Sequence, residues 1–90
     1  MKAFLLKISS PDGAVFEGNV QKFIVRGTEG DLAVMADHIP FVTAIKPGKC
    51  KIELEDGTVK TGSAESGLLT VSKDRTTLLS GTFSWEESEK

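Results

Sequence analysis

The clearest hydrophobic pattern in the chain lies at residues 49–55, where apolar and charged side chains alternate one by one. The apolar positions are Cys50, Ile52 and Leu54, with lysine or glutamate at every position between and beside them. Successive side chains of a strand point to opposite faces, so this segment predicts a strand that is buried on one face and solvated on the other. Asp56-Gly57 follows as a two-residue hairpin turn, and residues 58–61 are predicted to return as the partner strand.

Other short apolar segments of strand length recur along the chain and are separated by turn residues. The predicted strands cover residues 4–8, 14–17, 20–26, 32–35, 41–45, 67–71 and 76–80. Ser10-Pro11-Asp12-Gly13 predicts the first tight turn, Gly18-Asn19 a break between two strands, and residues 62–66 a bend. Pro40 predicts a further turn between residues 36 and 40, because proline cannot donate to a central ladder.

The spacing of these strands indicates an all-β fold without a useful amphipathic helix. We expect an antiparallel β-sandwich or flattened barrel of about ten short strands, which buries one face of each sheet. This domain is expected to span residues 1–84, and residues 85–90 are expected to form a polar C-terminal tail. Trp85 is interpreted as a cover over one end of the sandwich.

Size and charge exclude several classes of protein. Ninety residues fit one domain, and 11 basic against 13 acidic residues give a net charge of −2 without a basic cluster. Nucleic-acid binding is therefore not expected, since it depends on neutralising phosphates. Cys50 is the one cysteine, so no internal disulfide can form, and we interpret it as a small buried apolar residue. No apolar run approaches the length of a membrane span.

The candidate chemistry is sparse. His38, the one histidine, stands beside Asp37, but neighbouring side chains of an extended segment point apart, and one histidine cannot build a histidine-rich metal site. Residues 63–67 read S-A-E-S-G and lack the first glycine of a nucleophile elbow. Residues 27–30 read G-T-E-G and lack the Lys-Ser/Thr of a phosphate-binding loop. We therefore expect no catalytic residue, no metal site and no cofactor.

The block from Gly27 to Gly48 resembles the epsilon subunits of F-type ATP synthases. It contains a glycine-acidic-glycine turn, an apolar strand, a histidine, a proline and a strand with a threonine. The matching positions are Gly27, Glu29, Gly30, Leu32, His38, Pro40, Thr43, Ala44, Lys46, Pro47 and Gly48, and the likeness extends from Ile8 through Pro11, Phe16, Gly18 and Val20 to Gly67, Leu69 and Val71. Ala33, Ala36 and Asp37 depart from the glycine, proline and glycine common in the family.

This resemblance implies a β-sandwich that acts as a non-catalytic subunit of the central stalk and couples rotation to ATP synthesis. It implies contact with the gamma subunit at Ser10, His38 and Thr43, and contact with the proteolipid c-ring at Glu29, Gly30, Asp31 and His38. It further implies a peripheral membrane protein, held indirectly through the complex on the cytoplasmic face of a bacterial inner membrane or an equivalent energy-transducing membrane. We expect a monomer when the chain is isolated.

Two alternatives remain open from the residues alone. A small-ligand-binding β-sandwich unrelated to the synthase would need an apolar pocket with convergent polar groups, and an enzyme would need His38 for turnover. In most of the family a two-helix hairpin begins beyond the sandwich. The sequence ends at Lys90 instead, either because the natural subunit is short or because the chain was cut.

Overall fold

A computed structural model describes residues 3–36 and 39–86, and within them the chain forms nine strands and no helix. The strands are β1 (Phe4–Ser10), β2 (Gly13–Gly27), β3 (Gly30–Met35), β4 (Phe41–Ile45), β5 (Gly48–Leu54), β6 (Val59–Ala64), β7 (Gly67–Val71), β8 (Arg75–Ser80) and β9 (Phe83–Trp85). The prediction of an all-β fold is therefore confirmed, with one strand fewer than the ten or so expected.

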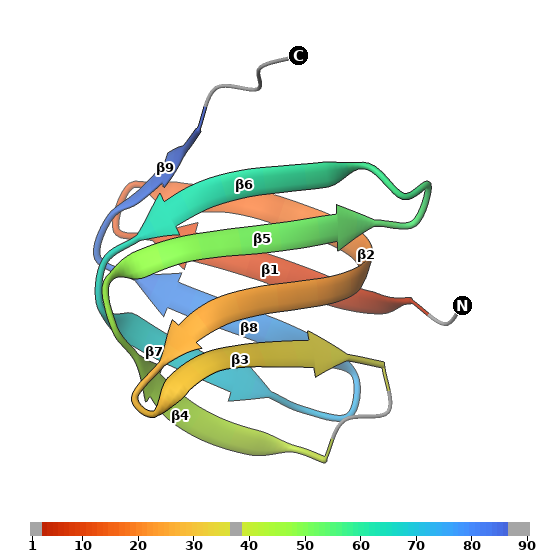
Figure 1. Cartoon of the computed structure of the whole chain (residues 1–90), viewed down its shortest axis with the longest axis horizontal. Helices are drawn as coiled ribbons and strands as arrows, with labels where there is room; N and C mark the ends of the chain where they lie inside the picture. The colour runs from red at the N-terminus through yellow and green to blue at the C-terminus, as the bar shows by residue number, and fades with distance from the viewer. Residues whose placement is uncertain (1–2, 37–38, 87–90) are drawn as a thin grey trace.

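The strands form two layers that share β2 (Figure 1). One layer contains β3, the second half of β2, β5, β6 and β9, and the other contains β4, β7, β8, β1 and the first half of β2. The change of layer falls at Gln21, where the register of β2 against β5 shifts. The Gln21 side-chain amide donates to the carbonyl oxygens of Leu54 and Glu55 at 3.1 and 2.8 Å, and these bonds secure the bend.

Two features of strand pairing differ from the sequence prediction. Gly18-Asn19 does not interrupt β2, because Leu6 and Leu5 of β1 are the register partners of these two residues and the ladder continues through them. In addition, β1 and β8 pair in parallel, whereas the other strand pairs in the described structure are antiparallel. The expectation of a wholly antiparallel sandwich is corrected on this one pair.

The hairpin between β5 and β6 has a longer loop than predicted. The Gly57 N–H donates to the Leu54 carbonyl oxygen at 3.0 Å, and the Leu54 N–H donates to the Thr58 carbonyl oxygen at 2.8 Å. The loop therefore contains three residues and closes with Gly57 at a φ of 91°, the geometry of a turn followed by a glycine bulge. The predicted bend at 62–66 is also shorter, because β6 continues through Ala64 against β5 and β9.

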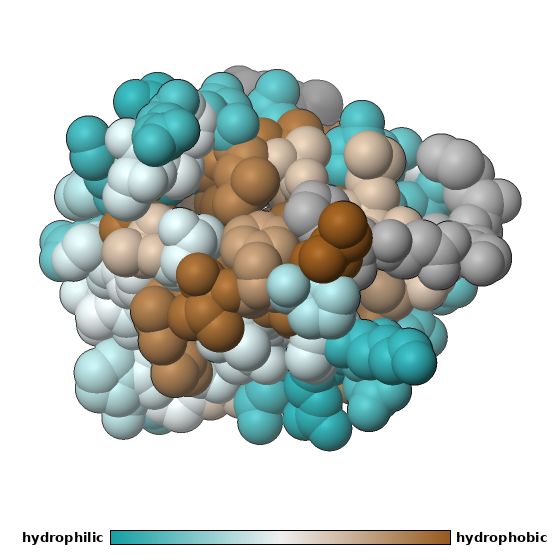
Figure 2. Space-filling view, turned by 90° about the horizontal axis from the view of Figure 1, so that it is seen from below, coloured by the Kyte–Doolittle hydropathy of each residue, from teal (hydrophilic) through white to brown (hydrophobic). Residues whose placement is uncertain are grey.

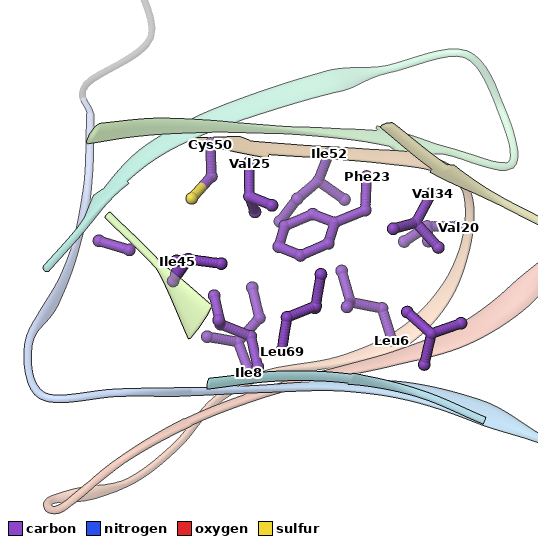
Figure 3. Packing of buried hydrophobic residues seen from close by; sticks show 13 residues of the cluster. Leu6, Ile8, Val20, Phe23, Val25, Val34, Ile45, Cys50, Ile52 and Leu69 are labelled. Atoms are coloured by element: carbon purple, nitrogen blue, oxygen red, sulfur yellow. The ribbon is translucent and has the colours of Figure 1, made fainter. Parts of the chain in front are cut away.

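The core fills the space between the two layers, and Phe23 lies near its centre (Figure 3). Its buried members are Leu6, Ile8, Val20, Phe23, Val25, Val34, Ile45, Cys50, Ile52, Ala64, Leu69, Val71 and Leu78. The alternation predicted for β5 is confirmed at Cys50 and Ile52, which are 1% and 0% exposed, while Leu54 is half-buried.

Aromatic side chains cover the core where β9 meets the first half of β2. The Trp85 ring meets Phe83 and Phe16 edge-on, with centroids 5.0 and 6.1 Å away, and the Lys60 ammonium lies 4.4 Å from the Trp85 centroid. Trp85 pairs with Gly62, and the Glu86 N–H donates to the Thr61 carbonyl oxygen at 2.9 Å. The ladder thus extends beyond the domain boundary expected at Ser84. Residues 87–90 of the expected tail lie outside the described residues.

Burial of Cys50 predicts a loss of stability at alkaline pH. Burial raises the pKa of the thiol from 9.0 to about 11, so above pH 9 the unfolded chain loses this proton while the folded chain keeps it. The free energy of unfolding should fall by about 2 kcal/mol between pH 8 and pH 10.5 from this group. Urea unfolding of the wild type and Cys50→Ala across this range checks the prediction, which fails if both curves fall equally.

Candidate functional site

The outer side of the layer formed by β4, β7 and β8 carries no charged side chain over two successive rows of register partners. We call this surface the uncharged face, and its residues are Val42, Thr70 and Thr77 in one row and Ala44, Leu68 and Leu79 in the next. Val42, Leu68 and Leu79 are 61, 43 and 51% exposed. Figure 2 shows apolar side chains gathered among polar ones on the side of the molecule where β4 lies. Such clustering on a small domain is typical of a protein-binding surface.

Strand β1 borders the uncharged face, because Ser9 and Lys7 are the register partners of Leu79 and Thr77. Ser10, one of the residues expected to contact gamma, follows Ser9 at the end of this border. Its hydroxyl accepts the Asp12 N–H at 3.3 Å and donates to the Gly13 carbonyl oxygen at 3.5 Å. Ser10 therefore helps to close the β1–β2 turn, and the residue is half-buried.

A second candidate surface is the acidic turn between β2 and β3. Gly27 and Gly30 are register partners and bracket Thr28 and Glu29 in a two-residue loop, with Gly30 at a φ of 128°. A side chain rarely adopts this conformation, which explains the glycine at this position. Asp31 accepts a hydrogen bond from Arg26 at 3.3 Å, whereas Glu29 forms no ion pair among the described residues.

The acidic turn and Thr43 line the same hollow. This hollow has a volume of about 410 Å³ and lies between β3 and β4. Both strands pair with β2, and β4 does so through the single bridge between Gly27 and Ile45. Its lining includes Glu29, Gly30, Asp31, Leu32, Phe41 and Thr43. The structure thus brings together three residues expected to contact the c-ring and one expected to contact gamma. His38, expected at both contacts, lies outside the described residues.

A larger hollow, of about 570 Å³, lies at the opposite end of the strands from the acidic turn. Apolar side chains line it, among them Phe4, Met35 and Val71, with Ser72 at the β7–β8 turn. The Ser72 hydroxyl is already engaged, since it donates to the Arg75 carbonyl oxygen at 2.9 Å and accepts the Arg75 N–H at 3.3 Å. Lys73, Arg75 and Thr76 also line this hollow, so it combines apolar with polar side chains.

The parts of the chain that the structure describes contain neither a metal-binding cluster nor a nucleophile elbow. Residues 3–36 and 39–86 contain no cluster of three or more histidine, cysteine or acidic side chains that could hold a metal ion. Ser63 lies within β6, and the following turn leads into β7, so the described segment has no helix to frame an oxyanion hole. No helix of the described structure is long and apolar enough to cross a bilayer.

Sequence reasoning missed the uncharged face. Its signal was the two leucine pairs at 68–69 and 78–79, because one leucine of each pair must point outward on a strand. Leu69 and Leu78 are fully buried, and their neighbours Leu68 and Leu79 are exposed side by side as register partners. Only the register shows that these residues meet Ala44 and Val42 on one surface.

Comparison with known proteins gives matches over nearly the whole chain. Residues 3–86 match the model of the ATP synthase Delta/Epsilon chain, beta-sandwich domain. The chain is 33% identical over 86 residues to the ATP synthase epsilon chain, sodium ion specific, of Acetobacterium woodii, covering 96% of this chain and 65% of that relative. It is 33% identical over 87 residues to the ATP synthase epsilon chain of Caldicellulosiruptor bescii, covering 97% of this chain and 63% of that relative. The chain thus spans slightly less than two thirds of these curated relatives.

Solved structures share the fold. A chain of the Euglena gracilis mitochondrial ATP synthase, in a structure of OSCP, F1 and c-ring, aligns with a TM-score of 0.87 at 20% identity, over 92% of this chain and 53% of that chain. A chain from the central stalk and c-ring structure of the Tetrahymena thermophila mitochondrial enzyme aligns with a TM-score of 0.73 at 14% identity, over 91% of this chain and 66% of that chain. At these identities the likeness bears on the fold alone.

Proposed function

Because the chain belongs to the ATP synthase delta/epsilon chain family, whose β-sandwich domain it matches over residues 3–86, we propose that it is a non-catalytic part of the central stalk of a rotary ATP synthase. In this role it binds the gamma subunit and the proteolipid c-ring, and it helps to couple rotation to ATP synthesis. It is held at the membrane indirectly, as a peripheral protein on the cytoplasmic face of a bacterial inner membrane or an equivalent energy-transducing membrane.

The uncharged face is the observation that carries the assignment of the gamma contact. Burying a charged group beneath a partner costs several kcal/mol unless the group is paired, so a surface without charges is suited to a contact that excludes water. Exposed Leu68 and Leu79 lie side by side on it as register partners. Ser10, which stands at a family position expected to lie near gamma, follows Ser9 at its border.

The acidic turn is the proposed contact with the c-ring. Glu29 and Asp31 place two exposed carboxylates beside a loop that Gly30 allows to turn tightly. A carboxylate pair at the rim of an interface fixes register and orientation against basic or amide groups of a partner more than it adds affinity. Val42 of the uncharged face and the acidic turn line one hollow, so the two proposed contacts adjoin.

The proposed mechanism is mechanical. Both layers are tied by one continuous β2, and a close-packed core transmits strain because it is nearly incompressible. Torque can pass through such a body from the ring contact to the gamma contact without bond chemistry or a cofactor. The chain's own role is therefore to hold two partners in a fixed relation.

Leu79→Lys is expected to weaken binding of the gamma subunit by at least about tenfold, because the ammonium group would lose water beneath the partner. Leu79 is 51% exposed, so the free chain can hold the lysine in solvent and should still fold. Isothermal titration of purified gamma into the wild type and the variant measures the change in Kd.

Val59→Lys is the matched control for this substitution. Val59 is 55% exposed but belongs to β6, in the other layer, so its replacement should change the Kd by less than about twofold. Thermal unfolding establishes that both variants are folded. Equal weakening by both substitutions, or unchanged binding by Leu79→Lys, would remove the gamma contact from the uncharged face.

A further inference from the structure

Strand β3 is an edge strand with a row of backbone groups that the described chain does not pair. The described structure pairs β3 with β2 and with no other strand. Exposed sheet edges of this kind can accept an extended segment from another chain, since the unpaired N–H and C=O groups are ready to continue the ladder.

The hydrogen-bonding phase identifies which groups of β3 face outward. Gly27 and Gly30 close the two-residue loop as a hydrogen-bonded pair, and such pairs alternate along an antiparallel ladder. The backbone groups of Leu32 and Val34 therefore point toward β2, and those of Asp31, Ala33 and Met35 point away. The opposite edge of β2 shows the same phase, because the Arg26 carbonyl oxygen faces away from β3 and accepts the Lys46 N–H at 3.0 Å.

The surroundings of this edge determine what kind of segment it would accept. On the inner side, half-buried Leu32 and Phe41 line the hollow of about 410 Å³ between β3 and β4. On the outer side, Ala33 is exposed and small, and carboxylates stand at Glu29 and Asp31. A matching strand would place apolar side chains over the hollow and, alternating with them, basic side chains beside the carboxylates.

We propose that an extended segment of the gamma subunit adds to the sheet as a further strand beside β3. This segment alternates apolar and basic residues and pairs with the outward backbone groups of Asp31, Ala33 and Met35. Val42 of the uncharged face lines the same hollow, so a gamma segment on β3 would be continuous with the gamma contact proposed there, and this favours gamma as the occupant. The inference rests on the proposed function, because it specifies how the gamma contact is made.

Ala33→Pro tests this proposal with little disturbance of the sandwich. Proline removes the outward N–H of residue 33 and leaves the bonds of Leu32 and Val34 to β2, and sheets tolerate proline at edge positions whose N–H faces solvent. The Kd for purified gamma should rise at least about tenfold, because the pairing loses a hydrogen bond and the ring obstructs the incoming strand. Ala33→Val, which keeps the N–H, should stay within about twofold of the wild type.

Amide hydrogen exchange of the wild type gives a second test that does not depend on how the proline variant folds. Saturating gamma should protect the amides of Asp31, Ala33 and Met35, whereas those of Leu32 and Val34 are already held by β2. If gamma binds but leaves both the three amides and the Ala33→Pro affinity unchanged, strand addition is wrong and the stalk function stands. Protection of the Ala33 and Met35 amides by purified c-ring alone would overturn gamma as the occupant. Folded wild type that binds no gamma would overturn both proposals.

Discussion

Replacing Phe23 by alanine is expected to lower the free energy of unfolding by about 3–5 kcal/mol, the largest loss that we expect from a single truncation in the core. Phe23 is fully buried in the second half of β2, and its ring points between the layers toward side chains such as Leu6 and Leu69 (Figure 3). Truncation removes the transfer free energy of the ring and leaves a cavity that two tied sheets cannot close. Urea unfolding at neutral pH measures the loss.

Phe23→Leu serves as the control for this prediction. It keeps most of the apolar volume and should cost less than about 1.5 kcal/mol if the surrounding side chains repack. The slope of the free energy against urea should be the same in the wild type and both variants, since each unfolds from the same compact state. A loss below 1 kcal/mol for Phe23→Ala would contradict the placement of this ring at the centre of the core.

Gly67→Ala is expected to destabilise the chain by at least about 3 kcal/mol, and to lower its Tm by roughly 12–24 °C. A Cβ at Gly67 would overlap the carbonyl oxygen of Leu79 and would come within 2.9 Å of the Ser80 Cα. Both are backbone atoms of β8, so no side-chain rotation can relieve the overlap and the β7–β8 ladder must open. Differential scanning calorimetry gives the Tm directly.

Gly81→Ala is the matched control for Gly67→Ala. An added Cβ at Gly81 meets no heavy atom within 4 Å, and Gly81 is exposed just after β8. This substitution should change stability by less than about 0.5 kcal/mol. Similar Tm values for both alanine variants would show that β7 and β8 do not approach as closely as the structure indicates.

Strands whose pattern is local could be predicted from the sequence. The alternation at residues 49–55 and the apolar run at 41–45 gave strands that the structure contains as β5 and β4. The continuity of β2 was not predictable in this way, because Gly18 and Asn19 are poor strand formers and are held extended by pairing with β1. The parallel pairing of β1 with β8 likewise depends on strands that are distant in sequence.

The candidate site was predictable in part for the same reason. An acidic turn at Glu29 and Asp31 can be identified from neighbouring residues alone. The meeting of this turn with Thr43 in one hollow depends on the bridge between Gly27 and Ile45, which no local pattern indicates. The leucine pairs predict outward side chains, but the uncharged face emerges only when the registers of β4, β7 and β8 are combined.

Titration of purified gamma into the ¹⁵N-labelled chain would map the gamma contact proposed for the uncharged face. Amide signals of β4, β7 and β8 around Val42, Leu68 and Leu79 should change on binding, together with the edge of β3. Signals around Lys49 and Val59, in the other layer, should stay in place. Changes confined to β5 and β6, or no change with folded protein at saturating gamma, would show that the uncharged face does not bind gamma.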